Sequence, residues 1–219
     1  MSERRVEDDF ALLEAWRGGD RGAGAELFER HYSSIARFFH NKVPESAQDD
    51  LLQETFHRAL ENAARFRGQA RFRTFLFGIA HNVLADYLRK LSRRMARLDS
   101  QADLEEMPSE SFGLSPVATV VQHQEQRLLL EALRRIPLIH QIALELFYWE
   151  ELTAEQIGEV LRVPLGTAKT RLRDGREHLE EQLRELARSP EVLQSTLDNL
   201  KQWAQRMRTR ATPATVGAS

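Results

Sequence analysis

The stretch from Thr153 to Leu179, TAEQIGEVLRVPLGTAKTRLRDGREHL, predicts two short helices joined by a tight turn. Apolar residues recur at helical spacing after Thr153, which is a suitable N-cap. The first helix ends before Pro164, because proline disfavours helical backbone in the residue that precedes it. A second helix then begins near Leu165. This arrangement predicts a helix-turn-helix, in which the second helix fits the major groove of DNA.

The predicted second helix has one apolar side and one basic, hydrogen-bonding side. The apolar side consists of Leu165, Ala168, Leu172 and Leu179. The opposite side consists of Thr167, Lys169, Thr170, Arg171, Arg173 and Arg176. Cations suit phosphates, which supply most of the affinity for DNA, whereas contacts with base edges specify the sequence.

The charge changes sign at the predicted turn. Residues 140–161 contain five acids and no Lys or Arg, whereas residues 162–176 contain five bases and one acid, Asp174. A solvated amphipathic helix pair would also carry runs of charge. The coincidence of the sign change with the turn favours DNA binding by the second helix.

The composition indicates an all-α protein with one or two domains. The chain has 219 residues, no cysteine and a formal net charge of −2, so nucleic-acid binding must come from local basic patches. Disulfides and thiolate metal sites are excluded. We find no apolar run near the ~20 residues of a membrane span and no signal-peptide core, and we expect a cytoplasmic protein.

An acidic helix is predicted over residues 46–64. Its apolar stripe consists of Leu51, Leu52, Thr55, Phe56, Ala59, Leu60 and Ala63. Its opposite face carries Asp49, Asp50, Gln53, Glu54, His57 and Glu61. Such a face is either solvated or docks on a basic partner, and the pattern alone leaves both interpretations open.

The next segment is basic, with nine Arg or Lys residues between positions 65 and 97 and one acid, Asp86. The predicted buried stripe consists of Phe72, Phe75, Leu76, Ile79, Ala80, Val83, Tyr87, Leu88 and Leu91. Off this stripe lie Thr74, Phe77, His81, Asn82, Asp86, Arg89 and Lys90. Exposed aromatic rings among cations are typical of single-strand binding, because bases stack on the rings and cations follow the backbone. Phe77 could instead pack under a neighbouring segment.

The remaining chain supplies a linker and further helices. Residues 99–116 hold five acids, no bases and two prolines, which predicts a flexible linker. We expect a helix ending at Gly18-Gly19, a second over 23–42 with Tyr32 facing inward, and two helices within 117–151. An amphipathic helix over 190–208 and a disordered tail follow.

Two blocks of sequence together resemble a known family. The first, from Asp49 to Lys90, is DDLLQETFHRALENAARFRGQARFRTFLFGIAHNVLADYLRK. The second, from Ala132 to Leu172, is ALRRIPLIHQIALELFYWEELTAEQIGEVLRVPLGTAKTRL. In this order they resemble regions 2 and 4 of the extracytoplasmic-function (ECF) group of the sigma-70 family, the specificity subunits of bacterial RNA polymerase. The resemblance covers roughly residues 22–185.

The resemblance implies an all-α fold of two small helical domains joined by a flexible acidic linker. The implied divisions are a region 2 domain at 1–98, the linker at 99–121, a region 4 domain at 122–187 and a C-terminal extension at 188–219. The implied partners are core RNA polymerase, through its largest-subunit clamp and its flap, promoter DNA, and an anti-sigma factor. No catalysis, metal, cofactor or small-molecule substrate is implied.

The resemblance also assigns site residues. Polymerase docking is implied for Asp49, Asp50, Gln53 and Glu54. Binding and melting of the −10 element are implied for Arg73, Phe77, His81, Asn82, Asp86, Arg89, Lys90, Arg93 and Arg94. Reading of the −35 element is implied for Thr167, Lys169, Thr170, Arg171, Arg173 and Arg176.

Several positions depart from the family pattern. Phe75 stands where tryptophan is usual, which keeps a core role. Arg162 occupies the turn position that glycine usually holds. Asp174 and Gly175 replace an Arg-Ala pair, so the grip on DNA near this point is expected to be weaker or shifted.

Two other classes of function were weighed. A free-standing helix-turn-helix regulator would bind duplex DNA alone, but it leaves the acidic face and the aromatic, basic segment without a role. A nucleic-acid enzyme using His57, His81 or His123 is disfavoured, because these histidines lack the spacing of metal ligands.

Overall fold

The computed structural model describes residues 2–63, 66, 71–95, 106–112, 124–187, 194 and 196. Over this part of the chain the regular structure is helical, which confirms the all-α prediction. The elements are α1 (Ser2–Arg17), α2 (Arg21–His40), α3 (Glu45–Ala63), α4 (Phe72–Met95), the 3-10 helix η2 (Ser109–Phe112), α5 (Gln124–Arg135), α6 (Leu138–Tyr148), α7 (Ala154–Leu161) and α8 (Leu165–Leu186). The helix predicted at 190–208 and the tail lie outside the described residues, apart from Gln194 and Thr196.

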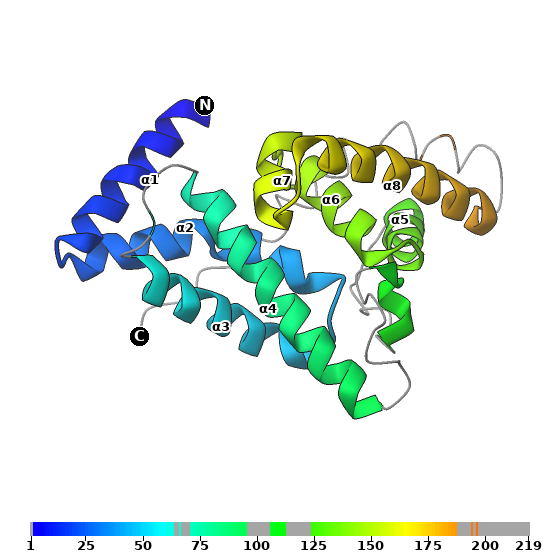
Figure 1. Cartoon of the computed structure of the whole chain (residues 1–219), viewed down its shortest axis with the longest axis horizontal. Helices are drawn as coiled ribbons and strands as arrows, with labels where there is room; N and C mark the ends of the chain where they lie inside the picture. Colours follow the sequence, from blue (N-terminus) through cyan, green and yellow to red (C-terminus); the bar gives the residue numbers. More distant parts are fainter. Residues whose placement is uncertain are drawn as a thin grey trace.

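Helices α1–α4 form the N-terminal domain, on the left and centre of Figure 1. Asp20 begins α2 by accepting hydrogen bonds from the backbone N–H groups of Gly22 and Ala23, at 2.8 and 3.1 Å. The core packs apolar residues from all four helices, including Leu13, Leu27, Leu52 and Leu76. The domain is therefore held by the helical stripes that the sequence predicts.

Helices α5–α8 form the C-terminal domain, and α7 with α8 is the predicted helix-turn-helix. Thr153 starts α7 with a capping box: its Oγ1 accepts from Gln156 N at 3.2 Å, and its N–H donates to Gln156 Oε1 at 2.9 Å. Arg162 closes the helix in the left-handed conformation, with φ 54° and ψ 44°. The expected cap and turn are both confirmed.

The middle of the predicted flexible linker is packed against the C-terminal domain. The backbone N–H of Leu138 donates to Met107 O at 3.0 Å, and Pro108 forms an isolated bridge with Pro137. Ser109 is fully buried, and its hydroxyl donates to Arg134 O at 3.4 Å. Residues 106–112 therefore depart from the predicted flexible linker, because the backbone groups before α6 need partners that this segment supplies.

The two domains pack directly on each other, with α7 in contact with α4. This contact buries a side of α4 that the sequence pattern leaves polar. Three apolar residues that were predicted to face inward are exposed instead: Tyr32 is 42% exposed, Leu60 47% and Leu165 44%. Tyr32 and Leu60 line a surface hollow beside α3, and Leu165 lies at the exposed start of α8.

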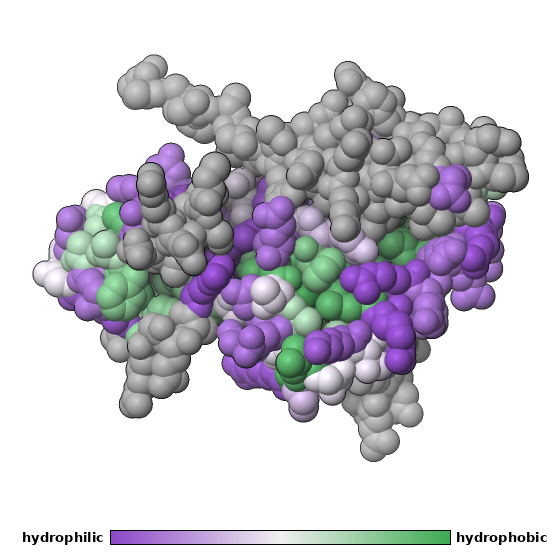
Figure 2. Space-filling view, turned by 90° about the horizontal axis from the view of Figure 1, so that it is seen from above, coloured by the Kyte–Doolittle hydropathy of each residue, from purple (hydrophilic) through white to green (hydrophobic). Residues whose placement is uncertain are grey.

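The described surface is mainly hydrophilic with hydrophobic patches between the charged side chains, as Figure 2 shows from above. None of the described helices combines the length and apolarity that crossing a bilayer requires.

Candidate nucleic-acid interface

The acidic face of α3 is open to solvent. Asp49, Asp50 and Gln53 are exposed, whereas Glu54 is half-buried and its carboxylate accepts from Arg58 Nε at 2.7 Å. These four residues are the ones predicted to dock on the polymerase, and the structure places them on one helical surface. Three of them therefore face solvent, while Glu54 also has a role within the fold.

An apolar hollow lies beside these acids. Tyr32 from α2 and Phe56 and Leu60 from α3 line it together with the acidic residues. The Tyr32 and Phe56 rings are nearly parallel, with centroids 6.2 Å apart. A surface that combines apolar rings with a charged rim is typical of a protein-binding site. Sequence reasoning missed this apolar part, because helical spacing placed Tyr32 and Leu60 in the core.

Phe77 of α4 does not face solvent. Its side chain is fully buried and contacts the Phe38 ring of α2, at a centroid distance of 5.9 Å. Thr74 and His81 on the same side of α4 are also buried. Of the two interpretations left open for Phe77, the buried one is confirmed and the exposed platform is not, because α2 and α7 enclose this side of the helix.

Arg73 of α4 is engaged with the C-terminal domain. Its guanidinium pairs with the Glu150 carboxylate, and Nη1 donates to the Glu150 backbone O at 2.7 Å. Arg37 of α2 approaches the same carboxylate, with Nε 2.8 Å from Oε1 and Nη2 3.2 Å from Oε2. The Glu150 side chain is 4% exposed. Arg73, which was predicted to bind the −10 element, is thus paired with an acid of the same chain.

Asp86 braces α4 against α3. Its carboxylate accepts from Arg58 Nη1 at 2.8 Å and from Arg89 Nη1 at 2.9 Å. The hydrogen bond from Arg58 is the largest cause that holds the pKa of Asp86 below its usual range. Asp86 was predicted to lie near the bases, and this ion pair gives it a structural role that the sequence did not indicate.

The C-terminal half of α4 presents the remaining predicted −10 residues. Asn82 is half-buried, and the four cations near the end of the helix are exposed: Arg89, Lys90, Arg93 and Arg94. Arg93 Nε donates to the Arg89 backbone O at 3.2 Å. This end of α4 offers a continuous basic surface to an anionic partner.

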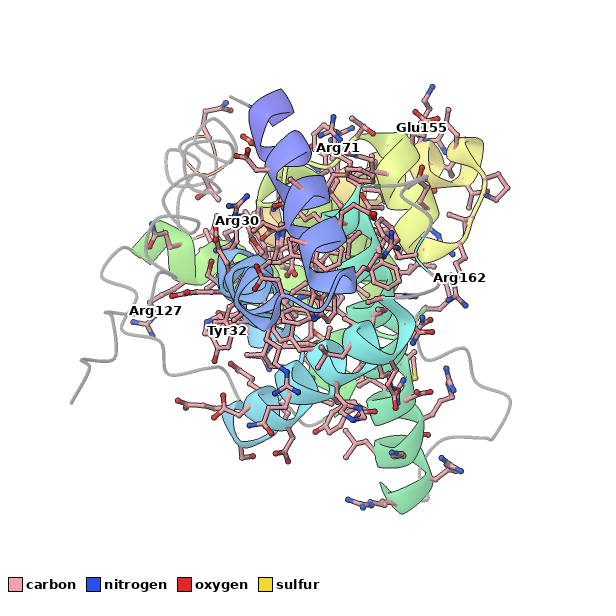
Figure 3. All side chains as sticks on the ribbon, turned by 90° about the vertical axis from the view of Figure 1, so that its left-hand side faces the viewer. Arg30, Tyr32, Arg71, Arg127, Glu155 and Arg162 are labelled. Carbon is pink, nitrogen blue, oxygen red and sulfur yellow. The ribbon has the colours of Figure 1, made fainter. Side chains whose placement is uncertain are left out.

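The first half of α8 is open. Thr167, Lys169, Thr170 and Arg173 are exposed, and Arg171 is half-buried. Ala168, Leu172 and Leu179 face the core as predicted. Figure 3 shows Arg162, at the turn before α8, and Glu155 on one side of the molecule and Tyr32 of the N-terminal domain on the other.

Two predicted −35 cations are engaged within the domain. Arg173 pairs with Asp174, with Nη2 of the arginine 2.8 Å from Oδ1 of the aspartate, and the carboxylate partly neutralises the positive charge of Arg173. Arg176 Nε donates to the Tyr148 hydroxyl at 3.0 Å, and its guanidinium lies over the Phe147 ring, 5.2 Å from the centroid. Arg176 is therefore held against α6, whereas the side chain of Lys169 is exposed on α8.

Gly175 lets α8 approach α6 closely. A Cβ added there would lie 3.2 Å from His140 Cβ and 3.2 Å from Leu144 Cγ. The departure from the usual alanine thus fits the helix packing. The expected change in grip on DNA stays a prediction.

A second ion pair lies wholly inside the contact between the domains. Lys42, at the end of α2, is fully buried and pairs with Glu145 of α6. Lys42 Nζ also donates to Phe38 O at 2.6 Å, and Gln141 Nε2 donates to Glu145 Oε1 at 2.9 Å. Burial raises the pKa of Glu145, which Lys42 and Gln141 oppose.

Sequence reasoning did not single out the residues that join the domains, namely Arg37, Lys42, Glu145 and Glu150. Lys42 and Glu145 each adjoin strongly apolar segments, and this position in the sequence could have indicated that they are buried and paired. Charged residues beside buried apolar ones are rarely fully buried unless they are paired. Their partners lie about a hundred positions away, so no local pattern could identify the pairs.

Comparisons with known proteins identify the family. Residues 27–94 match the model of sigma-70 region 2, and residues 126–179 match that of sigma-70 region 4. The chain is 30% identical over 178 residues to the ECF RNA polymerase sigma factor SigW of Bacillus subtilis, covering 77% of this chain and 92% of that protein. It is 28% identical over 196 residues to the ECF RNA polymerase sigma-E factor of Escherichia coli K12, covering 86% and 100%.

Two solved structures share the fold. One is CnrH in complex with the cytosolic domain of CnrY, with a TM-score of 0.58 and 20% identity over 82% of this chain and 99% of that chain. The other is the sigma factor RpoE in complex with the anti-sigma factor NepR from Bartonella quintana, with a TM-score of 0.56 and 19% identity over 75% and 97%. The two region matches and the 30% identity to SigW over most of both chains show that this chain belongs to the ECF group of sigma-70 family RNA polymerase sigma factors.

Proposed function

We propose that this sigma factor docks on core RNA polymerase through the acidic face of α3, binds the −10 element with α4 and reads the −35 element with the first half of α8. The observation that carries the proposal is the surface of α3, where three exposed polar residues adjoin an apolar hollow: Asp49, Asp50 and Gln53. A free-standing DNA-binding regulator has no use for such a surface, whereas a polymerase subunit requires one.

The proposed polymerase contacts are the coiled-coil clamp of the largest subunit, for α3, and the flap, for the C-terminal domain. The charges of α3 support the first contact, because an acidic face gains affinity and association rate from a basic partner. Contact with polymerase also assigns the chain to the cytoplasm. An anti-sigma partner is part of the proposal, supported by the fold that this chain shares with RpoE, whose structure contains NepR.

The proposed DNA contacts divide between the two domains. Opening a promoter must overcome stacking of about 1.4 kcal/mol per base-pair step. We assign capture of the opened strand to the half-buried Asn82 and to the exposed cations from Arg89 to Arg94. For the −35 element, Lys169 and Arg173 are assigned to phosphates, and Thr167 and Thr170 lie on the same exposed surface of α8.

The test is co-elution of the purified full chain with bacterial core RNA polymerase on size exclusion. The informative variant is Asp50→Asn with Gln53→Ala, since both side chains are exposed and their loss leaves the Glu54–Arg58 pair intact. Glu155→Gln is the control, because Glu155 is an exposed acid on α7, away from the acidic face of α3.

We expect the wild type and Glu155→Gln to co-elute with core polymerase and the double variant to elute apart from it. Co-elution of all three would contradict the docking face. A wild-type chain that stays apart from core polymerase but shifts duplex DNA by itself would support a free-standing regulator.

A further inference from the structure

Arg162, at the turn between α7 and α8, has a backbone conformation that suits glycine better. Its φ of 54° and ψ of 44° lie in the left-handed region, which glycine adopts without strain and an ordinary side chain does not. Backbone groups hold the turn: Arg162 N–H donates to Glu159 O at 3.3 Å, and Val163 N–H donates to Gly158 O at 2.9 Å. Neither hydrogen bond uses the arginine side chain, so glycine would form the same turn with less strain.

The side chain of Arg162 stabilises nothing in the described fold. It is exposed, and within the ranges that the structure describes its guanidinium forms no ion pair or hydrogen bond. Glu159 is exposed three positions earlier, and the two do not pair, whereas Arg17 and Glu14 pair at the same spacing in α1. A strained residue whose side chain has no structural role points to a function for that side chain.

The turn lies where a helix-turn-helix meets the edge of a DNA groove. In this motif the first helix crosses the DNA backbone, and the start of the second contacts base edges in the major groove. The residue that joins the two helices therefore lies beside the phosphates that border the groove. Arg162 and residues 164–167 are all exposed, which makes the turn continuous with the open first half of α8.

Two of the cations that were predicted to contact the −35 element are already engaged. Arg173 pairs with Asp174, and Arg176 donates to the Tyr148 hydroxyl of α6. Arg162 brings a positive charge that no acid neutralises to the same end of α8. A cation that meets a phosphate releases a counterion and so contributes affinity. Arg162 can therefore supply affinity that the engaged cations do not.

We propose that Arg162 contacts a DNA phosphate at the edge of the −35 element, just before α8 enters the major groove. This inference rests on the proposed function. The contact positions α8 on the duplex and reads no bases, because phosphates carry no sequence information. The turn thus loses some stability to gain a contact with DNA, and replacing Arg162 by glycine should separate the two effects.

The test compares two substitutions of Arg162 with a matched control. Arg162→Gly removes the charge and relieves the backbone, whereas Arg162→Lys keeps the charge. Arg127→Ala is the control, because Arg127 is an exposed arginine of the same domain that lies on the opposite side of the molecule from Arg162 in Figure 3.

Each full chain is assembled with core polymerase to form the holoenzyme. The probe is the duplex that the wild-type holoenzyme enriches most from a randomised DNA pool, and fluorescence anisotropy measures its binding at several salt concentrations. We expect Arg162→Gly to lower the slope of log K against log salt by about one unit and to weaken binding roughly tenfold at about 0.1 M salt. Arg162→Lys and Arg127→Ala should keep the wild-type slope. An unchanged slope in Arg162→Gly, or an equal fall in Arg127→Ala, would overturn the contact.

Lys169→Ala distinguishes a failure of this inference from a failure of the proposed function. If Lys169→Ala lowers the slope and Arg162→Gly does not, α8 binds DNA without Arg162 and the inference alone fails. A wild-type holoenzyme that enriches no duplex, or whose binding neither substitution changes, would contradict the proposed assignment of α8 and this inference with it.

Discussion

The two helices that we assign to promoter DNA differ in how the chain presents them. The recognition helix α8 exposes Thr167, Lys169 and Thr170 at its start, whereas α4 has one side under α7 and its Arg73 paired with Glu150. In this structure the first half of α8 is thus open, whereas α4 is partly covered. The difference shows that the exposure of a side chain predicted to bind DNA depends on packing between the domains, which the pattern of one helix does not contain.

Helix α7 packs at different distances against the turn that leads to α8 and against α4. A Cβ added at Gly158 would lie 2.9 Å from the Val163 backbone O, within the turn that leads to α8. A Cβ added at Gly78 of α4 would lie 4.0 Å from Val160 O, which is ordinary contact. We expect Gly158→Ala to lower the free energy of unfolding by about 2 kcal/mol, since overpacking against backbone cannot relax. Gly78→Ala is expected to be neutral or to gain up to about 1 kcal/mol from helix propensity.

Urea unfolding followed by circular dichroism measures both glycine variants. Equal losses in the two would show that α7 packs against α4 as tightly as it meets the turn, and would contradict the difference in packing.

The proposed contact of α8 with DNA phosphates can be measured by the salt dependence of promoter binding. In the chain bound to polymerase, Lys169→Ala should weaken promoter binding and lower the slope of log K against log salt by about one unit, as expected for one phosphate contact. Glu177→Gln, an exposed change farther along α8, is the control. Fluorescence anisotropy at several salt concentrations gives the slope, and an unchanged slope would remove Lys169 from the phosphate contacts.

Arg162 tests the turn that positions α8. This residue has φ 54°, a left-handed conformation that costs an ordinary side chain about 1 kcal/mol and costs glycine almost nothing. Arg162→Gly is therefore expected to raise the free energy of unfolding by up to about 1 kcal/mol, and Arg162→Ala should leave it nearly unchanged. A loss of stability in the glycine variant would mean that the arginine side chain stabilises the turn by its own contacts.

Two titratable groups, one in each domain, should respond to acid at different pH. Burial lowers the pKa of His140, between α6 and α8, so its contribution to stability is present above pH 6.5 and falls as the pH drops toward the lower folded value. The pKa of Asp86, between α3 and α4, is lowered chiefly by its hydrogen bond from Arg58, so its contribution is lost only below pH 3.8.

Thermal unfolding across this pH range, with His140→Gln and Asp86→Asn, should separate the two windows. His140→Gln should flatten the change between pH 7.5 and 5.5, and Asp86→Asn should leave that interval as it is. The same slope in His140→Gln and in the wild type would contradict the assignment.

Much of this fold could be predicted from local patterns. The spacing of apolar residues, the Thr153 cap and the break at Pro164 were sufficient for the helix-turn-helix, because these signals act over a few residues. The burial of Phe77 was not predictable in the same way, because α7 lies some eighty positions further along the chain. The ion pairs of Lys42 and Glu150 depend on the same distant packing, and their charges alone indicated solvated positions.

The most direct test of the contact between the two domains is a lysine-reactivity footprint of the full chain, read by mass spectrometry after brief acetylation. Lys42 is fully buried in the domain contact, whereas Lys90 on α4 and Lys169 on α8 are exposed. We predict that Lys90 and Lys169 react readily in the chain alone while Lys42 is protected. A Lys42 as reactive as Lys90 in the wild-type chain alone would contradict the closed contact and the account built on it.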